Sequence, residues 1–335
     1  MRRLKLIFIA LLALLPLQMS AAHSEGGEEL NMQEFIFGHI GDAYEWHITI
    51  VGGHHVSIPL PCIVIEDEVK VFSSRRMAEH GYTLNEDGKL VNAQTMERPI
   101  DISITKNVVG LMFSALLLVT LILLCSRWYR KHDVLKEKPT GIAALLEPVI
   151  VMINDDVIKD IIGPNHAKFS PYLLTAFFFI LINNLLGIIP IFPAGANVTG
   201  NIAVTCVLAL FTFFAVNLFG TKHYYKEIFW PEVPIFLKAL PIMPLIEVVG
   251  TITKPFSLMI RLFANILAGH IMILSVIGII FITAKMGAVL NGSLTFVSVL
   301  FGVFLSCLEV LVAFIQAYVF TMLSAVFIGM AQQKH

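Results

Sequence analysis

The C-terminal part of the chain reads as apolar, hydrocarbon-facing helix, yet it contains Arg261, His270 and Glu309. A guanidinium group at membrane depth costs at least about 3 kcal/mol on insertion scales, and it persists there only if a partner faces it. Arg261 has no acidic neighbour within eight residues on either side. We therefore expect the partner of Arg261 to lie on another chain.

Helical spacing groups further polar residues with these three. Arg261 and Asn265 are four residues apart, so they share one face of a helix, and Glu309 and Gln316, seven apart, also share a face. His270 follows Arg261 by nine residues, about half a turn round the helix and ~13 Å further along it. The sequence thus predicts two helices that each present a line of polar side chains.

An Asn291-Gly292 pair lies between the two apolar segments and favours a turn, which would make them an antiparallel hairpin. Positions whose numbers sum to roughly 580 would then lie at the same depth. This places His270 beside Glu309, and Arg261 beside Gln316.

This layout is suited to moving protons. His270 and Glu309 can exchange protons near neutral pH, whereas Arg261 stays protonated throughout. Glu247 precedes Arg261 by fourteen residues and would share its helix face. A permanent cation between two water-accessible half-channels would stop protons from leaking directly from one to the other. It would also favour the ionised form of a carboxyl group that comes near it.

Composition sets the protein class. Hydrophobic residues make up 57% of the 335 residues and charged residues only 14%, well below a soluble domain. The net charge of −1 is uninformative about partners, but the lack of a basic face speaks against nucleic acid. The four cysteines have no metal-binding spacing. We expect a membrane protein without a cofactor or a metal.

The N-terminal region has two parts. Residues 1–22 are typical of a signal peptide, with a basic start, an apolar centre and a small-residue cleavage site at Ala22. Residues 23–106 have mixed charge, and we expect them to form a small β-rich exported domain. We predict strands at 46–51 and 56–65 and a hairpin over 82–91.

Four histidines of this domain invite a metal hypothesis, but their spacing does not define one site, so ordinary surface histidines are the preferred interpretation. They are His39, His47, His54 and His55.

The rest of the chain, 107–335, is predicted to be an all-α polytopic membrane domain. Its last two segments, at 1.5 Å per residue, would each be about 58 Å long, so this helical hairpin must tilt or kink, and Pro255 offers a kink site. An amphipathic helix at about 142–162 is predicted to lie along the interface. The five predicted membrane helices span about 107–125, 171–191, 202–220, 245–283 and 293–331.

Charge asymmetry predicts the orientation. The segment after the first span is rich in lysine and arginine, which are enriched in cytoplasmic loops. The domain 23–106 would then be periplasmic and the C-terminus cytoplasmic, with the chain in a bacterial inner membrane.

Four runs of the sequence form a recognisable set: Asn184–Pro190, Ala196–Asn201, Glu247–His270 and Glu309–Leu323. They resemble, in that order, the second-span motif, the start of the third span and the last two helices of one family, subunit a of the F-type ATP synthases. The resemblance covers about 105–335 and contains these motifs in the family's order.

The resemblance implies a stator subunit of a rotary motor. Arg261 would face a ring of c subunits, separate two proton half-channels and drive deprotonation of the ring carboxylates. His270 and Glu309 would line the exterior half-channel, and Glu247 would lie toward the cytoplasmic exit. Gln316 and Asn265 would support the arginine. The implied partners are the c-ring, the b-subunit peripheral stalk, the rest of the synthase and membrane lipid, with nucleotide catalysis in other subunits.

Two features depart from the family pattern. Many bacterial relatives have a carboxylate at the position of His270 and a histidine at that of Glu309, so the two residue types are exchanged in this chain, and neither residue's individual role transfers. The long exported domain is also absent from most relatives. His270 and Asn265 are alternatively compatible with plain helix packing.

Two other classes of protein remain as alternatives. A self-contained ion-coupled secondary transporter would bind an anionic substrate at Arg261, but it predicts internal repeats, and none is visible. A membrane scaffold for the exported domain would leave the arginine, histidine and glutamate unexplained.

Overall fold

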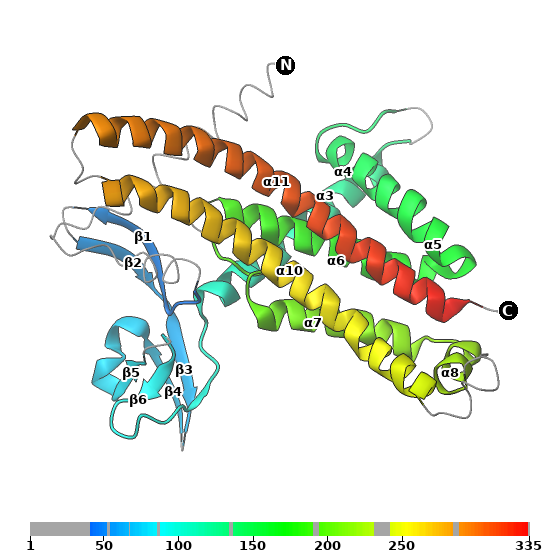
Figure 1. The fold of residues 1–335 in the computed structure, drawn as a ribbon, viewed down its shortest axis with the longest axis horizontal. Helices are drawn as coiled ribbons and strands as arrows, with labels where there is room; N and C mark the ends of the chain where they lie inside the picture. The colour runs from blue at the N-terminus through cyan, green and yellow to red at the C-terminus, as the bar shows by residue number, and fades with distance from the viewer. Residues whose placement is uncertain are drawn as a thin grey trace. The chain divides into compact units, whose positions relative to one another are not determined.

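Figure 1 shows the computed structural model of the chain. It describes residues 41–51, 54–66, 68–85, 88–133, 137–189, 194–230, 242–283 and 288–333. The chain divides into two compact units. Unit one comprises the described parts of 1–114, 183–198 and 267–310, and unit two those of 115–182, 199–266 and 311–335.

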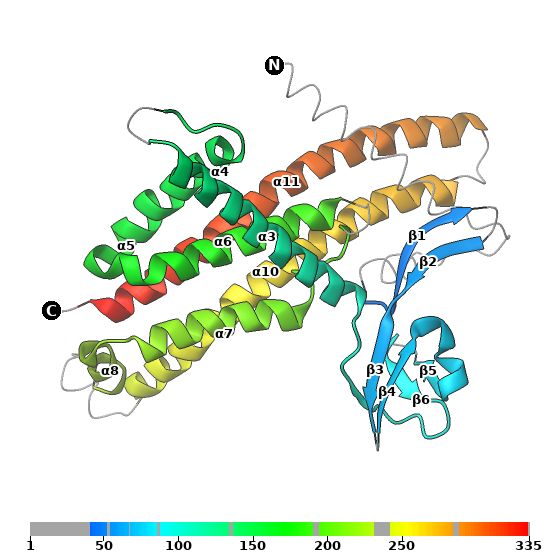
Figure 2. The same ribbon diagram turned by 180° about the vertical axis from the view of Figure 1, so that it is seen from behind.

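The N-terminal part of unit one is built from short antiparallel strands (Figure 2). In the three-stranded sheet β3 is central, between β4 and β7, and its Cys62 and Val64 are fully buried. The strands are β1 (Glu45–Val51), β2 (His54–Pro59), β3 (Pro61–Ile65), β4 (Val69–Ser73), β5 (Tyr82–Leu84), β6 (Leu90–Asn92) and β7 (Ile100–Asp101), with single turns η1 (Ser74–Arg76) and η2 (Ala78–His80). The small core consists of Tyr44, Cys62, Val64, Phe72, Met77, Tyr82 and Leu90.

Two strand predictions have different outcomes. The hairpin is confirmed, because β5 pairs with β6 in antiparallel register. The single strand over 56–65 is wrong, because the chain breaks at Leu60 into β2 and β3, which belong to different sheets. Pro59 and Pro61 flank the break, and neither has an N–H for a continuous ladder. Leu60 instead donates its N–H to the carbonyl of Tyr44.

Polar side chains close this core. Tyr44 donates its hydroxyl to Asp101 Oδ2 at 2.5 Å, and Asp101 Oδ1 accepts the Ser103 N–H at 2.9 Å. Burial by itself would raise the pKa of Asp101, but the hydrogen bonds from Ser103 and Tyr44 outweigh it and hold the pKa below its usual value. Burial raises the pKa of the Cys62 thiol to about 11. His39, together with the side chains of the other histidines in the metal hypothesis, lies outside the described residues.

The strand domain is hydrogen-bonded to the start of the first membrane helix, α3 (Lys106–Lys131). This part of α3 belongs to unit one. The Asp42 carboxylate accepts the Thr105 hydroxyl at 2.7 Å and the Asn107 N–H at 3.0 Å. The Lys106 N–H donates to the carbonyl of Ala43 at 2.9 Å. Asp42 thereby caps the first turn of α3, so the domain and this turn are held together.

The remaining described chain is almost entirely helical. Four stretches are long and apolar enough to cross a membrane, at 106–131, 142–188, 245–280 and 291–332, and a pair of helices bent by 100° could supply a fifth. The elements after α3 are α4 (Ile142–Val151), η3 (Met152–Lys159), α5 (Asp160–Ile162), η4 (Gly163–Asn165), α6 (His166–Ile188), α7 (Ile202–Leu218), α8 (Lys222–Phe229), α10 (Ile242–Thr283) and α11 (Ala288–Gln332).

The stretch 142–188 is not one straight helix. Its chain turns back at η4, where Gly163 has a φ of 74°, a left-handed value that glycine adopts without strain (Figures 1 and 2). Ser170 of α6 donates to Asn154 of η3 at 2.8 Å across the turn. The helix expected near 142–162 is therefore a separate element from α6, and its placement along the interface stays a prediction.

Unit two packs α6 against the C-terminal half of α11. Tyr172, Thr212 and Ser324 form a buried chain of hydroxyl groups that links α6, α7 and α11, with O–O distances of 2.8 and 3.1 Å. Hydrogen-bonded hydroxyls of this kind hold apolar helices in one register. The largest buried apolar residues around them include Ile153, Ile158, Leu173, Phe177, Leu258, Leu262, Phe320 and Ile328.

The predicted turn at Asn291-Gly292 is wrong. Both residues lie inside α11, which begins at Ala288, and the connection from α10 lies outside the described residues. The Asn291 carboxamide accepts hydrogen bonds from Thr283, the last residue of α10, and from Thr295 in the next turn of α11. These bonds give Asn291 a role inside a helix and compensate for its low helix propensity.

Candidate functional site

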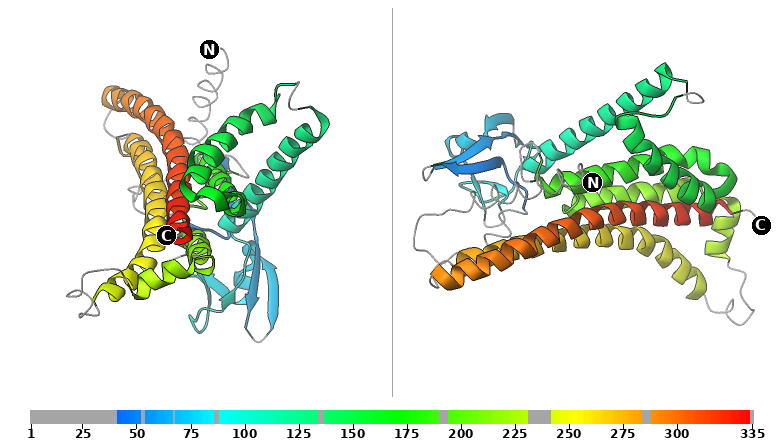
Figure 3. Two further views of the ribbon diagram at one scale, coloured as in Figure 1. Left: turned by 90° about the vertical axis from the view of Figure 1, so that its right-hand side faces the viewer. Right: turned by 90° about the horizontal axis from the view of Figure 1, so that it is seen from above.

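All the candidate residues predicted from the sequence lie on helices α10 and α11. The two helices run antiparallel and lie side by side in each view (Figures 1 and 3). Both consist mainly of leucine, isoleucine, valine and phenylalanine, with Pro255 inside α10, which continues through it. In such a segment each polar side chain must find a partner on a neighbouring helix or on another molecule.

His270 and Glu309 meet in unit one. The distance from His270 Nδ1 to Glu309 Oε1 is 2.8 Å, and the side chains are only 15% and 8% exposed. No donor within the described ranges makes a well-aligned hydrogen bond to Oε1, so the contact is a close approach of imidazole and carboxylate at ion-pair distance. The predicted proximity of His270 and Glu309 is confirmed.

Glycine makes room for this pair. A Cβ on Gly269 would lie 3.1 Å from Glu309 Oε1, closer than most side chains tolerate. A Cβ on Gly187 of α6 would lie 3.5 Å from His270 Nε2. The imidazole is thus enclosed by a third helix. Reasoning from the sequence missed Gly187 and Gly269, since the signal is a small residue whose position becomes meaningful only when the helices are packed.

A second polar pair joins the same two helices in unit two. Asn265 donates its Nδ2–H to Gln316 Oε1 at 2.8 Å. Gln316 is 4% exposed, whereas Asn265 is exposed on the surface of the chain. The sequence predicted Arg261 next to Gln316, but the amide of Gln316 is paired with Asn265, one helical turn further along α10.

Arg261 is exposed on α10. It makes no hydrogen bond or ion pair with any residue that the structure describes. The exposed residues near it on α10 include Phe256 and Ile260, at 58% and 38% exposure. An unpaired guanidinium therefore stands on an apolar helix surface.

Glu247 lies in the second turn of α10. Its side chain is half-buried, and its backbone carbonyl accepts the Thr251 hydroxyl at 3.0 Å. The structure does not bring Glu247 into contact with the other candidate residues. The candidate residues in unit two are thus one amide pair, one half-buried carboxylate and one exposed cation.

Similarity to known proteins gives this arrangement a family. The sequence family described as ATP synthase A chain matches residues 111–329. The chain belongs to the ATP synthase A chain family. A separate family, described as a domain of unknown function (DUF8433), matches residues 35–106. Together with the long apolar helices, membership in the ATP synthase A chain family makes the protein a multi-pass membrane protein.

Individual relatives agree with the family match. The chain is 45% identical over 236 residues to ATP synthase subunit a 2 of Chlorobaculum tepidum and 44% identical over 241 residues to that of Prosthecochloris aestuarii. These matches cover 69% of this chain, and they cover 64% and 69% of the relatives, about two thirds of their length. ATP synthase subunit a of Myxococcus xanthus is 36% identical over 300 residues, 88% of this chain and 85% of that protein.

Proposed function

We propose that the chain is the stator subunit a of a rotary F-type ATP synthase. It forms two proton half-channels against a ring of c subunits in a bacterial inner membrane. Arg261 separates the half-channels and forces each ring carboxylate to release its proton. The chain has no nucleotide chemistry of its own, which belongs to partner subunits, and it binds the c-ring and the b-subunit stalk.

The observation that carries this proposal is the exposed, unpaired Arg261 on an apolar surface of α10. A cation in hydrocarbon needs an anionic partner, and the described chain supplies none. On a rotating ring, the buried carboxylates of successive subunits would each become that partner in turn. Because arginine does not lose its proton, it attracts each carboxylate without passing a proton onward.

The polar pairs between α10 and α11 support the proposal of two half-channels. His270 and Glu309 combine an imidazole and a carboxylate at 2.8 Å, which is a proton-exchanging pair suited to the exterior half-channel. The Asn265–Gln316 hydrogen bond fixes α10 against α11 one turn from Arg261, whose side chain stays exposed. Glu247 is half-buried near the start of α10, and in this proposal it serves the cytoplasmic half-channel.

Proton pumping by inverted membrane vesicles tests the proposal. We expect Arg261→Ala to abolish ATP-driven acidification while a blot shows the c-ring and stalk subunits still assembled with the chain. The matched control is Arg127→Ala, which removes an exposed cation from the end of α3 outside the candidate site and should pump normally. Normal pumping by Arg261→Ala in an assembled complex would overturn the proposal.

A further inference from the structure

Helix α8 lies crosswise at the end of α7. Both helices belong to unit two, and the chain bends by 100° between them (Figures 1 and 3). α7 has 17 residues and no charged side chain, which gives about 25 Å of apolar helix. α8, in contrast, carries Lys222, Lys226 and Glu227 within a single short helix. The bend and these charges together put α8 at the bilayer surface where α7 ends, and not in the hydrocarbon.

Contacts within unit two fix the rotation of α8 about its own axis. Ile228 is only 8% exposed, so its side of the helix faces the protein. On the adjacent side, Tyr225 donates its hydroxyl to the carbonyl of Asn217 in the last turn of α7. The side of α8 that carries Tyr225 therefore faces back along α7, toward the bilayer.

Phe229 shares this side of α8 and extends from it. It follows Tyr225 by one helical turn, and it is 63% exposed. Lys222 and Lys226 lie on the flank, where long stems let their ammonium groups reach lipid headgroups. Glu227 is about 200° round the helix from Tyr225 and points to the opposite side. An aromatic side, a lysine flank and an acidic outer side are the pattern of an interfacial helix.

The start of α8 is tied to the end of α11. Thr221, which caps α8, donates its N–H to the carbonyl of Ala331 at 2.9 Å and its hydroxyl to that of Gln333 at 3.3 Å. The Gln332 side chain donates to the carbonyl of Phe219. Because these bonds join the α7–α8 turn to the last residues of α11, the depth of α8 also sets the depth of that end of α11.

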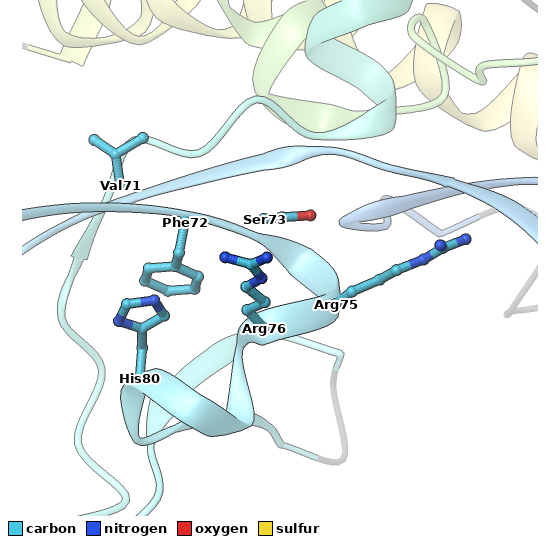
Figure 4. A pocket seen from close by; sticks show the side chains of 6 residues that line it. All are labelled: Val71, Phe72, Ser73, Arg75, Arg76 and His80. Atoms are coloured by element: carbon cyan, nitrogen blue, oxygen red, sulfur yellow. The ribbon is translucent and has the colours of Figure 1, made fainter.

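Cations and an aromatic ring also meet in the strand domain, with a different result. In its hollow, Arg76 and His80 extend toward Phe72 (Figure 4). The His80 ring stacks on Phe72 with centroids 4.7 Å apart, and Phe72 is only 6% exposed. That ring belongs to the core of the domain, whereas Phe229 is open to a molecule outside the chain.

We propose that α8 anchors the chain in the anionic lipid leaflet at which α7 ends. Phe229 enters the boundary between headgroups and acyl chains, and Lys222 and Lys226 contact lipid phosphates. Trp230, 66% exposed, follows directly, and aromatic residues of this kind gather at membrane interfaces. The anchor holds the end of α11 at a fixed depth, which is a role separate from proton transfer.

Photo-crosslinking of the full-length chain tests the proposal. Phe229→benzoylphenylalanine places a reactive ketone on the lipid-facing side, and Glu227→benzoylphenylalanine places it on the opposite side as the matched control. The chain, with the subunits that co-purify with it, is irradiated in nanodiscs that contain equal amounts of phosphatidylcholine and phosphatidylglycerol. Mass spectrometry distinguishes adducts with each lipid from crosslinks to protein. We expect lipid adducts at position 229, mostly with phosphatidylglycerol, and few at position 227.

Lys222→Gln should lower the ratio of phosphatidylglycerol to phosphatidylcholine adducts at position 229 about fivefold, the effect of one cation near a charged leaflet. Arg76→Gln, which removes a cation beside an aromatic ring in unit one, should leave the ratio unchanged. Crosslinks from position 229 to protein in place of lipid would overturn the proposal, since a protein segment would then cover this side of α8. Equal lipid adducts at positions 227 and 229, or equal adducts with the two lipids, would overturn it too.

Discussion

The contact between His270 and Glu309 predicts that exchanging the two residues preserves function while changing either one alone does not. His270→Glu would place two carboxyl groups at the site, and Glu309→His would place two imidazoles there. The double exchange restores one acid and one base in the same contact. Gly269 permits it, because an imidazole at position 309 still meets no Cβ on that side.

The size of the effect follows from the geometry. Two unit charges 2.8 Å apart interact by about 6 kcal/mol at an effective dielectric constant of 20. Removing one partner of a buried pair costs about 3–5 kcal/mol because the remaining charge stays desolvated. If about 1.4 kcal/mol of this cost is added to the barrier of the rate-limiting proton transfer, the rate falls tenfold. We therefore expect each single variant to pump at least about tenfold more slowly.

The assay is ATP-driven acidification of inverted vesicles with equal amounts of assembled complex. The double exchange should recover most of the rate that each single variant loses, and Ser306→Ala, on α11 but bonded only within its own helix, serves as the control. A double exchange as slow as the single variants, in an assembled complex, would refute the pair as a functional unit. Full activity in both single variants would refute it equally.

Two further predictions concern stability and reactivity. Burial raises the pKa of Cys62 to about 11, so at pH 8 its alkylation, followed by mass spectrometry, should be about 100-fold slower than in the unfolded chain. Equal alkylation rates in the folded and unfolded chain would contradict this. The contribution of the neutral thiol to stability is complete below the unfolded pKa of 9 and is lost as pH rises through about 11, so the melting temperature should fall over that pH range. Gly110→Ala should lower the melting temperature by a few degrees, because the added Cβ would lie 2.6 Å from the Cβ of Ala196. Gly250→Ala is the control, since open space surrounds that position. Equal melting temperatures of the two variants would contradict this packing.

Much of the fold could be predicted from local pattern. Long apolar runs at helical spacing indicated the helices, because burial in hydrocarbon requires internally bonded backbone. The β5–β6 hairpin followed from short β-forming runs on either side of a turn. The break at Leu60 was missed although Pro59 and Pro61 beside it cannot donate to a continuous ladder. The helical Asn291 was missed because its hydrogen bond with Thr283 forms between two helices and is not visible in local propensity.

The sequence by itself determined which groups can carry charge or protons, since residue type decides that arginine keeps its proton and that histidine and glutamate exchange theirs. It also determined that His270 and Glu309 could meet, because two antiparallel helices have a regular rise. Only the tertiary structure decided that Asn265 takes Gln316, that glycines enclose the histidine–glutamate pair, and that Arg261 is left exposed. These outcomes depend on helix rotation and on contacts across helices, which no spacing within one helix contains.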